Sequence, residues 1–189
     1  MSEVFTGRTD ISIITIGDKR PKIDESVFIA PGCRIIGDVT IGAGSSIWYN
    51  CVLRAEVNRI VIGARSNIQD GSIVHCDGPM PGVSDGYPTL IGDDVLIGHK
   101  AMVHGCVLHD RAFVGMCATI MNGAVVEGHG MLAAGAMLTQ GKRVEARQLW
   151  AGSPARYVRD LTDEQITGMQ IGVAHYADNA KLHMAALQG

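Results

Sequence analysis

Large aliphatic residues recur at every sixth position along most of this 189-residue chain. An alternating strand repeats every two residues and a helix about every 3.6, so neither produces a six-residue period. A coil of three short strands and three turns does produce it, with one aliphatic side chain pointing inward from each strand. The series pauses at insertions or a deletion and runs through Ile23, Ile29, Ile35, Ile41, Ile47, Leu53, Ile62, Ile68, Val74, Ile91, Ile97, Val103, Leu108, Val114, Ile120, Val126, Leu132 and Leu138.

A second column of residues agrees with this period. The fourth residue after each aliphatic is small or β-branched in the hexads from Ile29 to Leu132. The hexad at Val74 is left out of this comparison because a long insertion begins there. Each coil can bury its aliphatics only against its neighbours, so stacked coils must share one core. The sequence therefore predicts an all-β fold, a parallel β-helix shaped as a triangular prism over residues 23–144, after a lead-in strand in residues 1–22. The column reads Cys33, Val39, Ser45, Cys51, Val57, Ser66, Ser72, Val95, Ala101, Val107, Ala112, Ala118, Ala124, Gly130 and Ala136.

The end of the chain, residues 145–189, has a different pattern. The segment Ala151-Gly152-Ser153-Pro154-Ala155 predicts a turn out of the prism. Thr162 followed by Gln165 forms a capping box, which marks the start of a helix. Apolar residues then recur at spacings of three and four, which predicts one amphipathic helix packed on the prism. These residues are Ile166, Met169, Val173, Tyr176, Ala180, Met184 and Leu187.

Composition narrows the classes of function. The net charge is −3, so the chain has no basic field for nucleic acid or for an anionic membrane, and we expect neither as a partner. No apolar run approaches the ~20 residues of a membrane span. The five cysteines form no C-x-x-C pair, which favours reduced thiols and a cytoplasmic location.

Chemistry-bearing residues gather on one face of the predicted prism. With three hexads per coil, every third hexad shares a face. On one face, the residue after the aliphatic is Arg54, His75 and His104 in successive coils, where the other faces often have Gly or Ala. Stacked coils lie about 4.8 Å apart. Two imidazoles at that spacing can share a metal ion with bonds of about 2.0–2.1 Å, although a purely structural histidine pair is the alternative interpretation.

His99 is the third candidate ligand, but it belongs to a different face from His75 and His104. We therefore expect the three rings not to converge within one chain. Around a three-fold axis they could meet, if this face of one subunit packed against the His75 face of the next. The same docking would bring Arg54 against Asp70 of the neighbour, because Asp70 lies one coil below His99 and Arg54 one coil below His75. The sequence thus predicts a homotrimer with a metal ion and an ion pair at each interface.

With these motifs, the sequence resembles the γ-class carbonic anhydrases and their hexapeptide-repeat relatives over roughly residues 23–176. The resemblance implies a left-handed β-helix and the hydration of CO₂ to bicarbonate through a metal-bound hydroxide. It also implies a Zn²⁺ cofactor, with Fe²⁺ or Co²⁺ as alternatives. The motifs are Arg54-Ala55-Glu56, Asn67-Ile68-Gln69-Asp70-Gly71, His75, His99 and His104.

The resemblance also assigns roles to individual residues. His75, His99 and His104 match the metal ligands, two from one subunit and one from its neighbour. Gln69 matches the residue that orients the hydroxide, and Tyr176 matches a tyrosine of the C-terminal helix that lines the pocket. Arg54 and Asp70 match the intersubunit pair. Arg54 and Glu56 would also shape and polarise the pocket, and Asn67 belongs to the same motif.

Several positions depart from the family pattern. Glu56 stands where the family usually has Asp, and Val57 lacks the carboxylate that the prototype uses as a proton shuttle. The insertion from Cys76 to Thr89 lacks the prototype's long acidic loop, so we expect slow turnover. Cys76 itself could be a nucleophile, a fourth ligand or an inert thiol.

Two other functions remain open at this point. The same prism supports acyl-CoA transferases and thioesterases, which typically need one basic histidine rather than three. The chain could also form a non-catalytic trimer that keeps its metal for stability.

Overall fold

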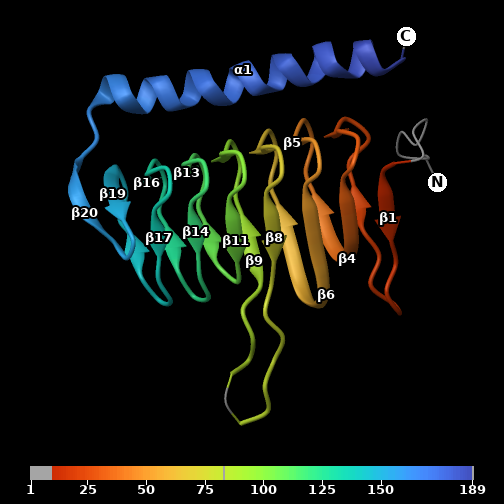
Figure 1. Ribbon diagram of the computed structural model, residues 1–189, viewed down its shortest axis with the longest axis horizontal. Coiled ribbons are helices and arrows are strands. Elements are labelled where there is room, and N and C mark those ends of the chain that lie inside the picture. Colours follow the sequence, from red (N-terminus) through yellow and green to blue (C-terminus); the bar gives the residue numbers. More distant parts are fainter. Residues whose placement is uncertain (1–9, 83, 189) are drawn as a thin grey trace.

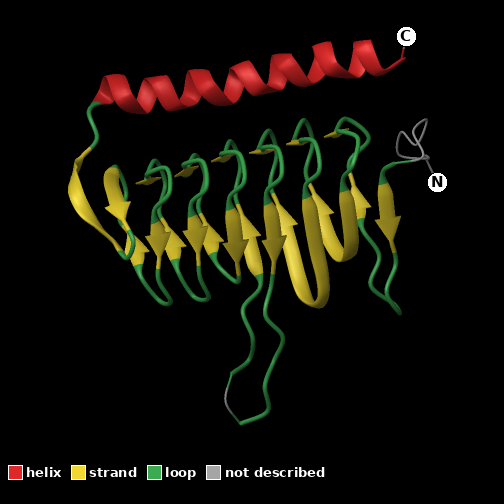
Figure 2. Ribbon diagram, in the orientation of Figure 1, coloured by secondary structure: helices red, strands yellow, loops and turns green. Residues whose placement is uncertain are grey.

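The computed structural model describes residues 10–82 and 84–188, and it shows a parallel β-helix with one long helix beside it (Figure 1). The strands of successive coils pair in parallel, so each face of the prism is a sheet (Figure 2). Over the described residues, one sheet has eight strands and covers one face. It comprises β3 (Phe28–Ile29), β5 (Ser46–Ile47), β7 (Asn67–Ile68), β10 (Leu96–Ile97), β13 (Phe113–Val114), β16 (Met131–Leu132), β19 (Gln148–Gly152) and β20 (Ala155–Asp160).

The other sheet, with twelve strands among the described residues, covers the two remaining faces. The two faces join because β4 and β6 are long enough to continue around a corner of the prism. The sheet comprises β1 (Ser12–Ile14), β2 (Lys22–Ile23), β4 (Arg34–Ile41), β6 (Val52–Ile62), β8 (Ile73–His75), β9 (Thr89–Ile91), β11 (Met102–His104), β12 (Val107–Leu108), β14 (Thr119–Ile120), β15 (Val125–Val126), β17 (Met137–Leu138) and β18 (Arg143–Val144).

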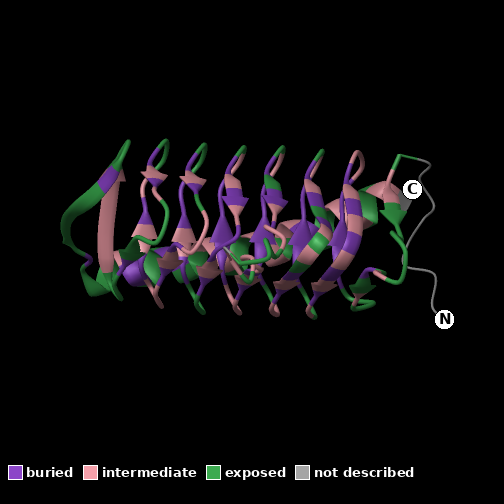
Figure 3. Cartoon of the chain, turned by 90° about the horizontal axis from the view of Figure 1, so that it is seen from below, coloured by how far each residue is buried: buried purple, intermediate pink, exposed green. Residues whose placement is uncertain are grey.

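The aliphatic column predicted from the sequence forms the core of the prism. Every member is buried except Ile23, which is half-buried and packs against the same cluster. Buried segments recur in each coil along the whole length of the prism (Figure 3). This burial confirms the six-residue period and the parallel β-helix.

The column of small residues needs two corrections. Val57 is 42% exposed, and Val107 is only half-buried. Both follow a change in the repeat: three residues are inserted in β6 after Leu53, and one residue is deleted after Val103. The equivalent buried positions belong to Ile60 and Cys106 instead, because each insertion or deletion shifts which side chains point inward.

The sheets extend past the predicted limits of the repeat domain, residues 23–144. At the start, Ser12 of β1 pairs with Arg34 of β4, so the lead-in segment already forms part of a coil. At the end, Met131 of β16 pairs with Leu149 of β19. The chain then turns at the predicted segment, and β20 returns antiparallel to β19.

The helix α1 (Asp163–Gln188) lies along the eight-stranded sheet and runs back over the coils (Figures 1 and 2). Its capping box forms as predicted: Gln165 N donates to Thr162 Oγ1 at 3.3 Å, and Thr162 N donates to Gln165 Oε1 at 3.1 Å. The seven predicted apolar residues are buried or half-buried. Among the described residues, no helix combines the length and apolar character that crossing a bilayer requires.

Candidate metal centre

The strand register brings Arg54, His75 and His104 into one column, as the face arithmetic predicts. Arg54 of β6 pairs with His75 of β8, and His75 pairs with His104 of β11. The Nδ1 atom of His75 lies 3.0 Å from the Nε2 atom of His104. Two imidazole nitrogens therefore face each other at the surface of the prism.

The environment of His75 favours its neutral form. Burial, together with the positive charge of Arg54 and the neighbouring His104, lowers its pKa to about 4. A neutral imidazole is the form that binds a metal ion. At neutral pH, His75 is therefore already in the protonation state of a ligand.

Glu56 lies beside the same histidine pair. Its Oε2 atom is 3.4 Å from His75 Nε2, and its Oε1 atom forms an ion pair with Arg54. The Arg54 side chain is 45% exposed, so the pair sits at the rim of the site. We call Arg54, Glu56, His75 and His104 the His75 half-site.

Sequence reasoning missed Asn122, which lies behind His104. Asn122 Oδ1 is 2.6 Å from His104 Nδ1, and Asn122 Nδ2 donates to Asp77 Oδ2 at 2.8 Å. Gly105, whose φ is 54°, leaves room for this side chain, because a Cβ at that position would collide with Asn122. The signal was available, because Asn122 is a large polar residue in a column that holds Ala55, Cys76 and Gly105 in the preceding coils.

His99 lies on the turn that follows β10, with partners of its own. Its Nδ1 atom is 2.7 Å from Asp70 Oδ2, one coil below, and its Nε2 atom is 3.2 Å from the hydroxyl of Tyr176 on α1. Because the carboxylate of Asp70 accepts, Nδ1 carries the proton and Nε2 accepts from the tyrosine. Burial, together with the charge of Asp70, raises the pKa of Tyr176, so its hydroxyl stays protonated.

Gln69 and Asn67 are buried close to His99, with 3% and 1% of their surface exposed. Gln69 Nε2 donates to Asn67 Oδ1 at 3.0 Å. Among the described residues, Asn67 Nδ2 has no hydrogen-bond partner. We call Asn67, Gln69, Asp70, His99 and Tyr176 the His99 half-site.

The two half-sites lie on different parts of the prism surface. Within residues 10–82 and 84–188 of one chain, no three His, Cys, Asp or Glu side chains come close enough together to hold a metal ion. Arg54 pairs with Glu56 and Asp70 with His99 inside the chain, so the expected Arg54–Asp70 pair between subunits stays a prediction.

The residues of the His75 half-site suit a divalent cation. Two Zn–N bonds of about 2.0–2.1 Å at a tetrahedral angle place their nitrogens about 3.3–3.4 Å apart. The two facing nitrogens of His75 and His104 are 3.0 Å apart, close to that value. His99 offers a further imidazole, and its contact with Asp70 through Nδ1 leaves Nε2 as the nitrogen for a cation. The donor set therefore fits a cation, if a second chain supplies the third imidazole.

The surroundings of Cys76 argue against a role as a nucleophile. Its thiol is buried, and burial raises its pKa. A thiolate is the reactive form, so this environment makes the side chain inert at neutral pH. All five cysteines of the chain are free thiols.

Comparison with known proteins places this architecture in a family. The family model "Bacterial transferase hexapeptide (six repeats)" matches residues 20–55 and 88–122. "Gamma carbonic anhydrase 1, mitochondrial" from Arabidopsis thaliana is 46% identical over 92% of this chain, which spans 63% of that relative's length. "Probable carbonic anhydrase" from Methanocaldococcus jannaschii is 47% identical, with 82% of this chain and 92% of the relative covered.

A solved structure agrees with the fold. The hexapeptide transferase family protein of Anaplasma phagocytophilum superposes with a TM-score of 0.83 at 41% identity, and the match covers 90% of this chain and 96% of the other. That protein is named a transferase, whereas the two sequence relatives are named as anhydrases. The fold, the repeat and these identities together show that this chain belongs to the γ-class carbonic anhydrase-like branch of the hexapeptide-repeat proteins.

Proposed function

We propose that this protein is a carbonic anhydrase that hydrates CO₂ to bicarbonate at metal sites between three copies of the chain. The observation that carries the proposal is the complementarity of the two half-sites. One presents two facing imidazole nitrogens, and the other presents a single imidazole, that of His99, which Asp70 holds through Nδ1. The names of the relatives at 46% and 47% identity support the choice of reaction.

In this proposal, His75 and His104 of one chain and His99 of the next hold the cation. Zn²⁺ is the cation we propose, and Fe²⁺ or Co²⁺ also suit imidazole ligands. Such a cation supplies Lewis-acid activation, which makes water nucleophilic at neutral pH. The neutral imidazoles leave its full positive charge available, and the low pKa of His75, about 4, keeps that residue uncharged.

The remaining residues would orient reactants and handle the proton. The buried amide of Gln69, fixed by Asn67, would orient the attacking water by a hydrogen bond. Hydration of CO₂ yields bicarbonate and one proton. Glu56 is the carboxylate beside His75, so it would accept that proton and pass it to buffer. Val57 is exposed but cannot carry a proton, so we expect proton export to limit turnover.

The first experiment combines metal analysis, mass in solution and a stopped-flow CO₂ assay on anaerobically purified protein. We expect trimers with one divalent cation per chain and CO₂ hydration above the uncatalysed rate. A His99→Ala variant should lose hydration. If that variant hydrates CO₂ at the same rate as the natural protein, the proposal fails.

Subunit complementation tests the shared site directly. The His99→Ala and His104→Ala variants should each be inactive. When they are co-expressed in equal amounts, random assembly leaves about a quarter of the interfaces with all three imidazoles intact. We therefore expect about a quarter of the natural activity. A double variant, His99→Ala with His104→Ala, co-expressed with His99→Ala, is the control and should recover nothing.

Acyl transfer is the second candidate, because the Anaplasma relative is named a transferase. Turnover of an acyl-CoA thioester by chelator-treated protein would favour it. Dissociation of trimers on metal removal, without turnover of either substrate, would instead favour a non-catalytic metal-bearing trimer. The cytoplasmic location also stays a prediction, since the name of the Arabidopsis relative places that protein in mitochondria.

A further inference from the structure

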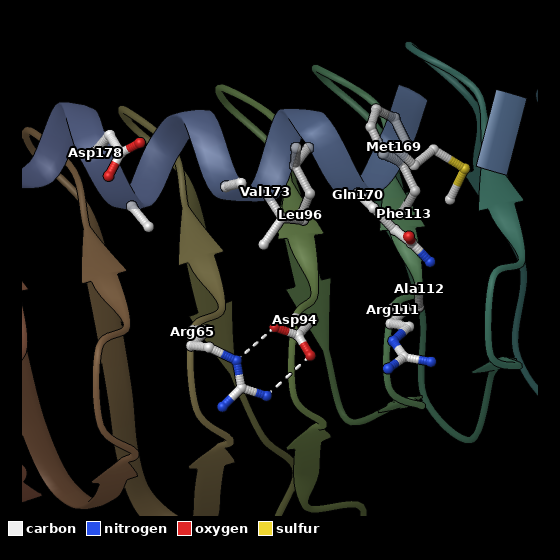
Figure 4. A pocket seen from close by; sticks show the side chains of 12 residues that line it. Arg65, Asp94, Leu96, Arg111, Ala112, Phe113, Met169, Gln170, Val173 and Asp178 are labelled. Carbon is white, nitrogen blue, oxygen red and sulfur yellow. Dashed lines mark hydrogen bonds and ion pairs between the residues drawn. The ribbon is translucent and has the colours of Figure 1, made fainter. Parts of the chain in front are cut away.

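A cavity of about 410 Å³ lies between α1 and the eight-stranded sheet (Figure 4). Its walls are Leu96 of β10, Phe113 of β13, and Met169 and Val173 of α1. This volume is within the range of small-molecule sites, roughly 300–1,000 Å³. We call this cavity the helix cleft.

The helix cleft adjoins the groove of the His99 half-site, because Leu96 and Phe113 line both, but it contains none of the residues of that half-site. Tyr176 and His99 line a different groove, and neither lines the helix cleft. The cleft exists because α1 presents small side chains, Ala174 and Ala177, over the corner of the prism. Larger residues at these two positions would fill the space.

Charged residues from one corner of the prism form the mouth of the cleft. Successive coils place Arg65, Asp94 and Arg111 at the same left-handed turn position, with φ of 56°, 56° and 63°. All three line the cleft along one row below its apolar wall (Figure 4).

Most of these charges are already paired, and one is not. Arg65 binds Asp94 through two hydrogen bonds, Nε to Oδ1 at 2.7 Å and Nη2 to Oδ2 at 2.9 Å. On the helix side, Asp178 is held by Lys181 at 2.9 Å. Within the part of the chain that the structure describes, the guanidinium of Arg111 forms no ion pair or side-chain hydrogen bond. Arg65 also forms an ion pair with Asp93, so among the charged residues that line the cleft, Arg111 is the one for which the described residues offer no partner.

We propose that the helix cleft binds a small amphipathic carboxylate, with its carboxylate on Arg111 and its alkyl chain between α1 and β13. A guanidinium binds a carboxylate through two parallel hydrogen bonds, which selects an anionic and planar group. The alkyl chain would leave water for the surfaces of Leu96, Phe113 and Val173. This proposal does not depend on the proposed function, because none of these residues belongs to either half-site.

Isothermal titration with decanoate tests the proposal. We expect saturable binding near the millimolar range, as befits a ligand of this size. Arg111→Gln should weaken binding by about tenfold or more, because it removes a charge-assisted contact. Ala174→Trp should block binding by filling the cleft, and it adds bulk only at a helix surface position that is exposed. Both variants should keep the CO₂ hydration activity of the natural protein.

Two controls separate specific binding from general attraction. Arg156→Gln removes the same charge from the exposed β20 hairpin, away from the cleft, and should bind decanoate as the natural protein does. Decylamine has the same chain length and the opposite charge, and it should bind far more weakly. Absence of saturable decanoate binding, equal affinity for decylamine, or unchanged binding in both Arg111→Gln and Ala174→Trp would overturn the proposal.

Discussion

The Nδ1 atom of His104 lies 2.6 Å from the Oδ1 atom of Asn122, and this contact fixes the tautomer of the histidine. The amide group of Asn122 donates to Asp77, so its oxygen must face the ring. An oxygen acceptor there requires the proton on Nδ1, which leaves the lone pair of Nε2 directed at His75. Asn122 thus orients His104 for the role of ligand that we propose for it.

Replacing Asn122 by Ala should weaken cation binding by about 10–100-fold, the usual effect of losing a partner behind a metal ligand. Asn122→Asp combined with Asp77→Asn keeps an acceptor facing His104 and moves the amide donor to position 77, so it should retain most of the affinity. Titration of Co²⁺ against a competing chelator, followed by its visible absorption, measures both. Equal affinity in the natural protein and in Asn122→Ala would show that the contact does not position His104.

The fold could be predicted from the sequence because every coil has to bury its aliphatic side chains in the same way. An aliphatic side chain must point inward from every strand, so residues such as Ile120, Leu132 and Leu138 recur with a fixed period. The column of Arg54, His75 and His104 could be predicted from the same period, because parallel pairing places equivalent residues of successive coils directly above one another.

Contacts that depend on breaks in the period could not be predicted in the same way. Val57 lies just after an insertion and Val107 just after a deletion, and each of these changes which positions point their side chains inward. Asp77 reaches Asn122 from the insertion after β8, whose antiparallel bridges, Asp77 with Tyr87 and Met80 with Ser84, have no counterpart in the repeat. The contact of Asp70 with His99 within the chain was likewise not predicted, whereas the pair of Asp70 with Arg54 of a neighbouring subunit stays a prediction.

The start of α1 depends on its capping box. Thr162→Ala removes the acceptor for Gln165 N and should lower the free energy of unfolding by about 1 kcal/mol. Urea unfolding at fixed protein concentration measures the change. Thr167→Ala is the matched control, because the hydroxyl of Thr167 bonds only to a carbonyl inside the helix. A loss in Thr167→Ala as large as that in Thr162→Ala would argue against a specific cap.

The prism core should be intolerant of cavities. Leu132 is 0% exposed, so Leu132→Ala should lower the free energy of unfolding by about 2–5 kcal/mol. Leu182 of α1 is 68% exposed, and Leu182→Ala should change that free energy by no more than about 0.5 kcal/mol. Similar urea midpoints for the two variants would mean that the stacked aliphatics do not hold the coils together.

The pair of Arg65 and Asp94 should make stability depend on acidic pH. Hydrogen bonds from Arg65 hold the pKa of Asp94 below its ordinary value of 3.8. A carboxyl group with a lower pKa in the folded state stabilises the fold above its unfolded pKa, and the effect disappears as the pH falls through the folded pKa. Asp94→Asn should therefore lower stability at pH 7 and cease to differ from the natural protein in strong acid.

The size of this effect should be small, because the pair is partly exposed: about 1 kcal/mol or less at low salt. Urea midpoints of the natural protein and Asp94→Asn, measured between pH 7 and pH 3, check the sign and the pH window. Arg65→Gln should cause a similar loss, and combining the two substitutions should add little, because each one already breaks the same contact. High salt should reduce the difference, since it screens partly exposed charges. A difference that grows as the pH falls from 7 to 3 would mean that Asp94 destabilises the fold when it is ionised, the opposite of what its contacts with Arg65 predict.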